Sequence, residues 1–287
     1  MKVIYGRREY IGGVVQKVAD LHIHTIASDG SYRPEEAVKI AKKMKISAIA
    51  ICDHDSVDGI EPALEAGKLY RVKVIPAVEM CYEEGPTGVH IVGYFIDWRN
   101  ATLKEALREI QQGRFRRIRD IVDRLSEIGI EITLADVLAE AAEGSVLTRP
   151  HVARAMVKRG YVKSESEAFE KYLIYGRPAY VNRYQLPLGE IMRLIRNSGG
   201  VPVLAHPKYQ DAIKFVPYLV ELGLKGIEVY HPDHTPKEVA RFKKIAKKYG
   251  LIEIGGSDAH GAERPIGTVT VPYEIVERLE KARPEMI

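Results

Sequence analysis

Histidines and acidic residues gather at the ends of short β-branched runs in this sequence. The runs are Val18–Leu21, Ala48–Ile51, Val72–Ile75, Val89–Val92, Val201–Leu204, Gly226–Val229 and Leu251–Ile254. The polar residues at or just beyond their ends are His22, His24, His54, Glu79, His206, His231 and His260, while His90 lies within the fourth run. Ligands gather at the carboxyl ends of strands in parallel α/β folds, so we expect these side chains to converge on one rim.

Two short spacings place pairs of these side chains on one face of a strand. The His-Ile-His segment at residues 22–24 does so because side chains alternate along a strand, and the Asp-Ala-His segment at 258–260 repeats the pattern with a carboxylate. Asp29 follows in a Ser-Asp-Gly turn and can reach back over the first strand end. One histidine at a strand end is usually a structural residue, but so many equivalent ones predict a site for several metal ions. Imidazoles mixed with carboxylates favour zinc, manganese or iron over calcium.

The elements that must position these residues form a repeating pattern. Each apolar run is followed by a helix-like segment, such as Pro34–Met44 or the one that opens at Thr235-Pro236 and stops before Gly250. Runs that are apolar on both faces are typical of parallel strands covered by helices. Seven such runs predict an α/β fold, either a parallel barrel or a doubly wound sheet.

Residues 101–197 keep a helical period instead of this alternation. Apolar residues recur from Leu103 to Ile128 with the spacing of one helix face. Further helices are expected over Leu134–Ala142, Pro150–Arg159, Glu165–Ile174 and Leu188–Arg196. We therefore expect a helical insertion between the fourth and fifth strands, with residues 1–100 and 198–287 forming one discontinuous barrel. The inserted lobe is expected to cover the barrel mouth and to restrict substrate size.

Composition excludes several classes of protein. The chain has 287 residues with 43 Lys and Arg against 39 Asp and Glu, and a net charge of +4 is too mild for a duplex nucleic-acid binder. The two cysteines, Cys52 and Cys81, exclude a disulfide framework and are expected to be small apolar fillers. No phosphate-loop or dinucleotide fingerprint is present. No signal core or run of about 18 apolar residues occurs, so we expect a cytoplasmic protein with no membrane contact and no obligate protein partner.

Several motifs together resemble the PHP (polymerase and histidinol phosphatase) family of metal-dependent phosphoesterases. They are Asp20-Leu21-His22-Ile23-His24-Thr25, Ser28-Asp29-Gly30, Asp53-His54-Asp55, Glu79, His90, Ala205-His206-Pro207 and Gly256-Ser257-Asp258-Ala259-His260. The resemblance implies a distorted seven-stranded (β/α) barrel that holds three divalent metal ions. The ligand sets that it implies are His22, His24, Glu79 and Asp258; Glu79, His90 and His206; and Asp29, His54 and His260, with Glu79 bridging the first two ions.

Motifs in and after the insertion resemble the branch of this family that acts on nucleoside 3′,5′-bisphosphates and the 5′ ends of short RNA. They are Thr148-Arg149-Pro150-His151-Val152-Ala153, Gly176-Arg177-Pro178-Ala179-Tyr180-Val181 and Gly226-Ile227-Glu228-Val229-Tyr230-His231-Pro232. The resemblance implies a phosphatase or exonuclease that removes phosphate from a nucleotide end. The alternatives are a phosphatase for a small non-nucleotide ester, such as histidinol phosphate, and a barrel that binds metal without catalysis.

Charge counting supports a phosphate substrate. Three divalent ions would carry +6 against −3 from the carboxylates of Asp29, Glu79 and Asp258, and the remaining +3 favours a phosphate dianion. Water shared between metal ions can act as hydroxide near neutral pH. His231 is expected to contact the phosphate or to protonate the leaving oxygen, and His234 is expected to bind the substrate nearby.

Arginines of the insertion are expected to bind a second phosphate. Arg149 and His151 flank Pro150 at an expected helix start, which is a suitable place for an anion. Arg149 is expected to contact the second phosphate of the substrate, with Arg177 and Arg183 as further candidates. The basic cluster Arg114, Arg116, Arg117 and Arg119 is expected on a solvated helix face that could guide an RNA tail.

Overall fold

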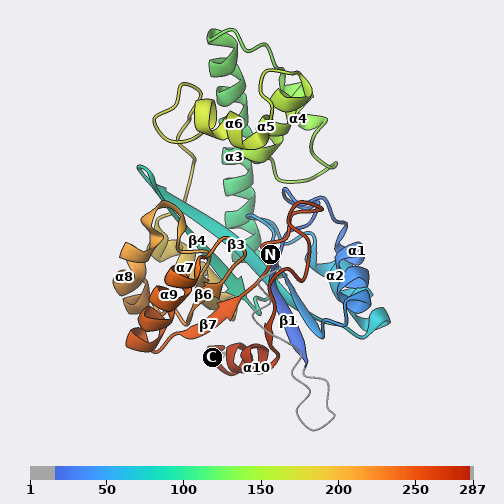
Figure 1. Ribbon diagram of the computed structural model, residues 1–287, viewed down its shortest axis with the longest axis vertical. Coiled ribbons are helices and arrows are strands. Elements are labelled where there is room, and N and C mark those ends of the chain that lie inside the picture. Colours follow the sequence, from blue (N-terminus) through green and yellow to red (C-terminus); the bar gives the residue numbers. More distant parts are fainter. Residues whose placement is uncertain (1–16, 285–287) are drawn as a thin grey trace.

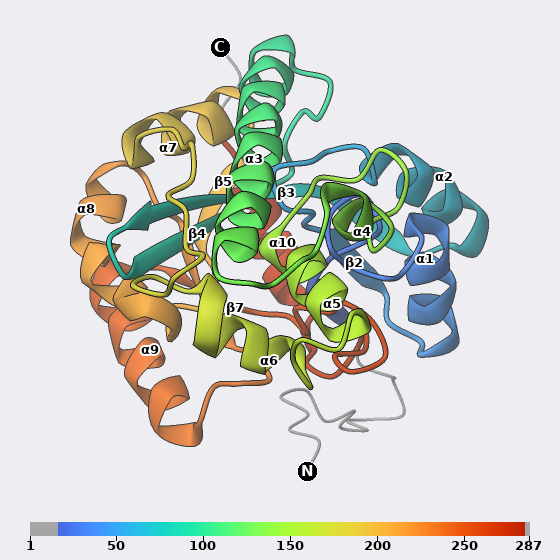
Figure 2. The same cartoon turned by 90° about the horizontal axis from the view of Figure 1, so that it is seen from above.

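The computed structural model describes residues 17–284, which form a barrel with a helical lobe above it (Figures 1 and 2). The long helix α3 (Ala101–Glu127) rises out of the barrel and carries the lobe. Residues 1–16, where no signal core is expected, lie outside the described residues. No helix in the described part of the chain is long and apolar enough to cross a membrane.

Eight strands form one mixed sheet that curls into a nearly closed barrel. The strands are β1 (Val18–Ile23), β2 (Ala48–Ile51), β3 (Lys73–Glu84), β4 (Thr87–Tyr94), β5 (Val201–Leu204), β6 (Gly226–Tyr230), β7 (Ile252–Gly255) and β8 (Val271–Pro272). Their order is β7-β6-β5-β4-β3-β2-β1-β8. Just beyond β7, Ala259 forms a parallel bridge with Ile23 at the end of β1, which brings the two sides of the barrel together.

The seven predicted runs are all strands, but two features of the predicted sheet are wrong. β4 runs antiparallel to both β3 and β5, because β3 is much longer than predicted and turns directly into β4 through Gly85 and Pro86. Gly85 has a φ of 58°, a left-handed conformation that glycine adopts without strain. The eighth strand, β8, has only two residues and is too short to leave a pattern in the sequence.

Helices cover the outside of the barrel. They are α1 (Pro34–Lys43), α2 (Ile60–Tyr70), α7 (Leu188–Asn197), α8 (Val216–Glu221), α9 (Pro236–Tyr249) and α10 (Glu274–Lys281), with a 3₁₀-helix over Tyr209–Phe215. The expected helix from Pro236 is confirmed: a capping box of Thr235 and Glu238 starts α9, and Gly250 ends it with a φ of 64°. α10 lies across the lower end of the barrel (Figure 1), where Val276 and Leu279 enter the barrel core.

The lobe has a core of its own. Its helices are α3, α4 (Leu134–Leu138), α5 (Arg149–Lys158) and α6 (Glu165–Ala168), and α6 continues as a π-helix over Phe169–Leu173. Residues such as Ile121, Val152 and Met156 are buried between them. In contrast, Leu107 on the first half of α3 and Ile195 on α7 belong to the cluster in which α7, α8 and α9 pack on strands β3 to β6. The expected insertion therefore begins and ends with segments that pack on the barrel.

Candidate metal centre and arginine pocket

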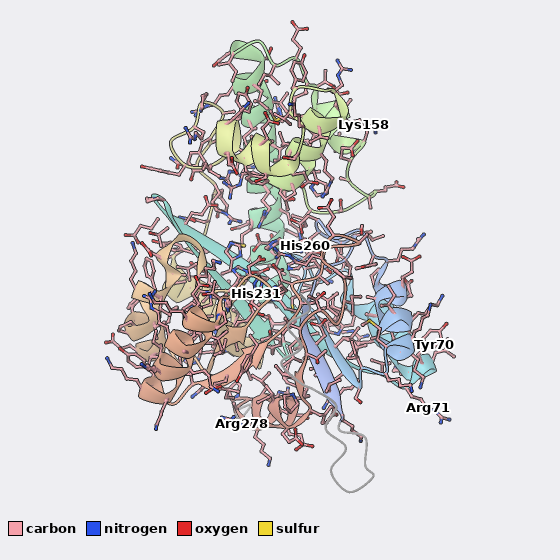
Figure 3. The ribbon with its side chains drawn as sticks, viewed as in Figure 1. Tyr70, Arg71, Lys158, His231, His260 and Arg278 are labelled. Atoms are coloured by element: carbon pink, nitrogen blue, oxygen red, sulfur yellow. The ribbon has the colours of Figure 1, made fainter. Side chains whose placement is uncertain are left out.

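The nine residues expected to bind metal lie together at the upper end of the barrel, beneath the lobe. Figure 3 shows His260 at this junction, with His231 lower in the barrel. We call these nine residues the rim cluster; they are His22, His24, Asp29, His54, Glu79, His90, His206, Asp258 and His260. Six of the nine are buried, and His54, His90 and His260 are the partly exposed members.

Glu79 is at the centre of the rim cluster. Its Oε1 lies 2.8 Å from Nδ1 of His90 and 2.9 Å from Nε2 of His206. Its Oε2 lies 3.2 Å from His24 and 3.2 Å from His54, and 3.4 Å from His22. Five imidazoles thus surround one buried carboxylate. Glu79 lies within β3 rather than after it, because the third strand extends well past its predicted end.

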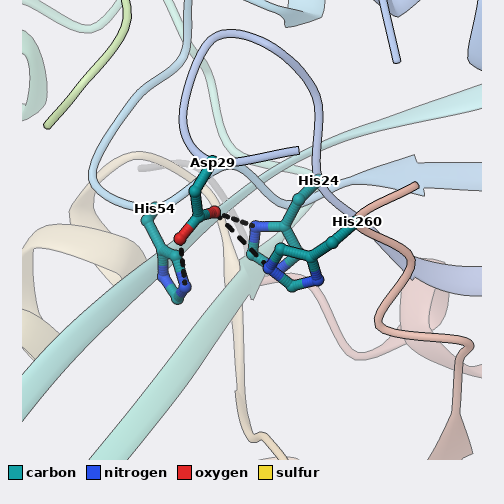
Figure 4. Close-up of side chains that lie close together, drawn as sticks. All are labelled: His24, Asp29, His54 and His260. Carbon is teal, nitrogen blue, oxygen red and sulfur yellow. Dashed lines mark ion pairs between the residues drawn. The ribbon is translucent and has the colours of Figure 1, made fainter. Parts of the chain in front are cut away.

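A second group forms around Asp29 (Figure 4). The Asp29 carboxylate lies 3.4 Å from Nε2 of His260, 3.9 Å from Nδ1 of His24 and 4.0 Å from Nε2 of His54. Asp258 completes the opposite side, with Oδ1 3.2 Å from Nε2 of His24. These side chains come from the loops that follow β1, β2 and β7, and therefore from distant parts of the sequence.

Backbone geometry explains why these loops meet. The bridge between Ile23 and Ala259 places the segment after β7 beside the end of β1, and a second bridge joins His54 to Glu79. His206 and Asp258 have positive φ values of 23° and 47°, which non-glycine residues rarely adopt. Such conformations persist where surrounding contacts fix them, as they do around this cluster.

Three further buried carboxylates hold the cluster in place. Glu228 accepts a hydrogen bond from the backbone N–H of His206 at 2.8 Å and lies 3.2 Å from Nδ1 of His22. Asp53 accepts from the backbone and hydroxyl of Thr25, and Asp20 accepts from Ser257. The positioning role of Glu228 was not predicted, although an acidic residue inside an otherwise apolar strand is a signal for it.

The electrostatics of the rim cluster call for added positive charge. Burial alone would raise the pKa of Glu79, but His54, His90 and His22 outweigh it and hold the pKa well below its usual range. Burial would lower the pKa of His24, yet hydrogen bonds with Asp258 and Glu79 raise it to about 10. The carboxylates therefore attract cations strongly, whether protons on imidazoles or metal ions.

The donor set fits divalent metals. Groups of imidazole nitrogens and carboxylate oxygens that lie within 4.8 Å of one another include His24, Asp29, His54 and His260; His22, Glu79 and His206; and His22, His24 and Asp258. Among the described residues, Nδ1 of His24 and Oδ1 of Asp29 are buried without a hydrogen-bond partner. Buried polar atoms are normally satisfied, so these two atoms point to a missing ligand.

Not all of the residues expected to bind substrate are free to contact a ligand beside the rim cluster. His231 is buried and lies 3.2 Å from Oδ2 of Asp258, so its contact is with a member of the rim cluster. His234 is buried against Phe242, and its Nδ1 lies 2.9 Å from the carbonyl of Val229. These positions favour a structural role for His234 and a positioning role for His231.

The three candidate substrate-binding residues of the insertion, His151, Arg177 and Arg149, also differ in position. His151 is buried, and its Nδ1 lies 3.0 Å from the backbone N and from the hydroxyl of Thr148, which caps α5. Burial lowers the pKa of His151 to about 4, so it caps the helix in the neutral form. Arg177 is exposed and does not line the cavity beside the rim cluster. Arg149 does line it.

That cavity, which we call the arginine pocket, has a volume of about 170 Å³ and lies between the rim cluster and the lobe. Asp29, His54 and His90 form its rim side, and four guanidinium groups form its lobe side: Arg114, Arg117, Arg149 and Arg183. Two carboxylates face them. Asp55 pairs with Arg114 and lies 3.3 Å from Arg183, while Glu83 lies 3.3 Å from Arg117 and 3.2 Å from Arg149.

The prediction of a solvated basic face on α3 is correct for Arg116 and Arg119 and wrong for Arg114 and Arg117. The latter two are 8% and 5% exposed, because they occupy the helix face that also carries Leu107, Ile110 and Ile121. Burial lowers the pKa of Arg117 to about 9, and the like charges of Arg149 and Arg183 act in the same direction against Glu83. The pocket therefore has an excess of positive charge.

The two cysteines differ. Cys52 is fully buried in the barrel core, as expected for an apolar filler, and burial raises the pKa of its thiol. Cys81 lines the arginine pocket, with Sγ 3.5 Å from Nδ1 of His54, so the filler prediction is wrong for it. Burial would raise the pKa of the Cys81 thiol, but His90, His54 and Arg183 hold it well below its usual range.

A barrel whose rim collects imidazoles and carboxylates beside a cation-lined pocket is the architecture of a metal-dependent phosphoesterase. Residues 20–229 match the PHP domain family, and the chain belongs to this family. It is 31% identical over 84% of its length to a 3′,5′-nucleoside bisphosphate phosphatase of Chromobacterium violaceum, of which 86% is covered. It is 33% identical to the 5′-3′ exoribonuclease Rnm of Escherichia coli, over 85% of each chain.

A solved structure gives the same picture of the fold. The chain superposes on a Bifidobacterium adolescentis protein, provisionally assigned as a metal-dependent phosphoesterase, with a TM-score of 0.86 and 28% identity. The match covers 93% of this chain and 97% of the other. The protein is therefore a metal-dependent phosphoesterase, as its sequence motifs predict.

Proposed function

We propose that this enzyme hydrolyses phosphate monoesters of nucleotides that carry a second phosphate, with nucleoside 3′,5′-bisphosphates as main substrates and the 5′ ends of short RNA as further ones. The observation that carries this proposal is the charge of the arginine pocket. On its lobe side, four guanidinium groups face the carboxylates of Asp55 and Glu83, which gives 4 − 2 = +2 before the rim residues Asp29, His54 and His90 are counted. Buried charge needs a partner, and the missing partner here is an anion.

One atom in the pocket marks where such an anion would bind. Nε of Arg183 is buried and has no hydrogen-bond partner among the described residues, although its Nη2 pairs with Asp55. A phosphate dianion would satisfy this donor and balance the two surplus charges together. The pocket shares Asp29, His54 and His90 with the rim cluster, so one substrate can reach both. The names of the two relatives, one for bisphosphates and one for RNA, agree with this substrate class.

The rim cluster would hold three divalent ions of manganese, zinc or iron. We assign His22, His24, Glu79 and Asp258 to the first, Glu79, His90 and His206 to the second, and Asp29, His54 and His260 to the third. When bound, such ions lower the pKa of water and stabilise charge on phosphoryl oxygens. The carboxylates leave a net positive charge at the rim, which suits a dianionic substrate.

The chain's own residues then have distinct tasks. His231 and Arg264 both contact Oδ2 of Asp258 and so orient this carboxylate toward the rim. Arg149, Arg117 and Arg183 bind and orient the second phosphate. The lobe over residues 101–197 closes the upper side of the site and selects substrates by size, because Leu147, Thr148 and Phe169 form the pocket wall opposite the barrel.

A comparison of three substrates tests the proposal. With manganese present, release of inorganic phosphate is measured for adenosine 3′,5′-bisphosphate and histidinol phosphate, and release of mononucleotides is measured for a 5′-phosphorylated short RNA. We expect the highest kcat/KM for a substrate with two phosphates. A clear preference for histidinol phosphate would replace the proposal with the small-ester alternative, and no turnover of any of them with metal bound would favour a non-catalytic barrel.

A further inference from the structure

One aromatic ring stands at the edge of the cavities around the rim cluster. Beside the arginine pocket lies a second cavity of about 570 Å³, bordered by His54, His90, His206, Asp258 and His260. Phe169 lines both cavities and is the only Phe, Tyr or Trp among their lining residues. Phe169 is only partly buried, so part of it is accessible to a ligand.

The position of the ring is fixed by Arg149. Phe169 begins the π-helix Phe169–Leu173, and the Arg149 guanidinium lies 5.7 Å from the centroid of its ring. The same guanidinium donates a hydrogen bond of 3.1 Å to the carbonyl of Leu173 at the other end of this helix. Single-turn π-helices are rare and frequently occur at functional sites. Arg149 thus contacts both ends of the π-helix and also lines the pocket proposed for the second phosphate.

The rest of the second cavity is suited to a flat ring. Away from the rim cluster its lining consists of the small residues Gly88, Ala205 and Ala212, which leave space for a flat group, and of Ser166, Phe169 and Arg264. A phenyl ring offers no charge or hydrogen bond to a phosphate, but every nucleobase has a π-face that can stack on it. The cavity adjoins the rim where the reacting phosphate would bind.

We propose that Phe169 is the stacking platform for the nucleobase of the substrate and a determinant of specificity for nucleotides. This inference rests on the proposed function and deepens it. The reacting phosphate lies at the rim, the second phosphate in the arginine pocket, and the base on Phe169 within the second cavity. Arg149 connects the last two sites, because it pairs with Glu83 in the pocket and lies against the Phe169 ring.

The test compares substrates with and without a base. Wild type, Phe169→Leu and Phe169→Tyr are assayed on adenosine 3′,5′-bisphosphate and on its abasic analogue, tetrahydrofuran 3,5-bisphosphate. Stacking on an aromatic side chain contributes roughly 5- to 150-fold in affinity. We expect Phe169→Leu to lower kcat/KM for the adenosine substrate by such a factor, to leave the abasic analogue nearly unchanged, and Phe169→Tyr to retain the preference for the base.

A matched control excludes a general effect of losing a ring from this segment. Tyr175 lies just beyond the π-helix, is 53% exposed and lines neither cavity, so Tyr175→Leu should behave as wild type. Equal losses on the adenosine and abasic substrates in Phe169→Leu would overturn the inference, because they would show that Phe169 only supports Arg149 or the lobe. An unchanged preference for the base would overturn it as well.

A binding measurement separates this inference from the proposed function. Titration calorimetry gives the affinities of AMP and of ribose 5-phosphate for wild type and Phe169→Leu without requiring turnover. If adenosine 3′,5′-bisphosphate is a poor substrate but the wild type binds AMP more tightly than ribose 5-phosphate and the variant does not, the proposed function fails and the stacking role stands. If bisphosphates are turned over but AMP binding shows no dependence on Phe169, only the stacking role fails.

Discussion

The rim cluster and the arginine pocket share a wall but have opposite charge requirements. The rim has three buried carboxylates among imidazoles, and it needs cations. The lobe side of the pocket has four guanidinium groups against the carboxylates of Asp55 and Glu83, and it needs an anion. Residues such as Asp29 and His54 border both regions. Neutralising either region alone leaves the other incomplete, so a metal-bound phosphoester with a second phosphate suits the pair better than either ligand alone.

The largest expected effect comes from breaking the rim at its centre. Glu79→Gln removes the charge that five imidazoles face, so the protein should lose bound metal and roughly 10³-fold or more in turnover. Elemental analysis and phosphate release measure the two losses. Glu84→Gln, an exposed acid on the same strand, is the control and should retain both. An unchanged metal content in Glu79→Gln would contradict the bridging assignment.

The two regions also differ in how well the sequence predicts them. The rim is predictable because most of its residues lie at or just beyond the end of an apolar strand, and the alternation of side chains along β1 and the residue after it places His22 and His24 on one face. Parallel strand ends then bring these residues together whatever the details of the helices. Only the extension of β3 through Glu79 and the reversal of β4 were missed, since both depend on the length of a hairpin.

The arginine pocket could not be predicted in the same way because its contacts are long-range. Arg114 meets Asp55 across 59 residues, and Arg117 meets Glu83 across 34. One signal was present: both arginines fall on the apolar face of α3, in register with Ile110 and Ile121. A charged residue on that face indicates either a long side chain that reaches water or a buried ion pair, and only the fold shows which one applies.

Acidification should weaken the pocket through Glu83. Burial would raise the pKa of Glu83, but Arg183, Arg117 and Arg149 lower it to about 2. The folded-state pKa is thus below the unfolded one, so the stabilisation is present above about pH 4.5 and is lost as the pH falls toward 2. It amounts to at most about 3 kcal/mol. The free energy of unfolding, measured with denaturant from pH 6 to pH 2.5, should fall more steeply for wild type than for Glu83→Gln. Parallel curves would refute the stabilising role of the Glu83 ion pairs.

Substitution of Arg149 tests whether the arginine pocket binds the second phosphate of the substrate. A charged hydrogen bond of this kind contributes roughly 1.5–3 kcal/mol, or about 10- to 150-fold in specificity. Arg149→Ala should therefore lower kcat/KM for adenosine 3′,5′-bisphosphate relative to AMP by such a factor and leave metal content intact. Arg116→Ala, on the exposed face of α3, serves as the control. If both substrates lose the same factor, Arg149 contacts the reacting phosphate or only supports the fold.

The smallest effect separates the two regions without any catalysis. In protein treated with a chelator, sulfate should bind the arginine pocket and raise the unfolding midpoint, because Nε of Arg183 is a buried donor with no partner among residues 17–284. At about ten times its Kd, sulfate would stabilise the fold by about 1.4 kcal/mol. Manganese should instead act at the rim. Sulfate should therefore stabilise wild type and Glu79→Gln equally, whereas manganese should stabilise only wild type.

Arg183→Gln should show the reverse pattern, with a response to manganese and none to low sulfate. Its control is Arg177→Gln, which removes an exposed arginine of the lobe and should respond to both ligands. Sodium chloride at matched ionic strength corrects for screening of surface charges, and millimolar sulfate keeps its general stabilising effect small. A sulfate response in Arg183→Gln as large as that of wild type would place the anion elsewhere, and the comparison of a cation-binding rim with an anion-binding pocket would then fail on the pocket side alone.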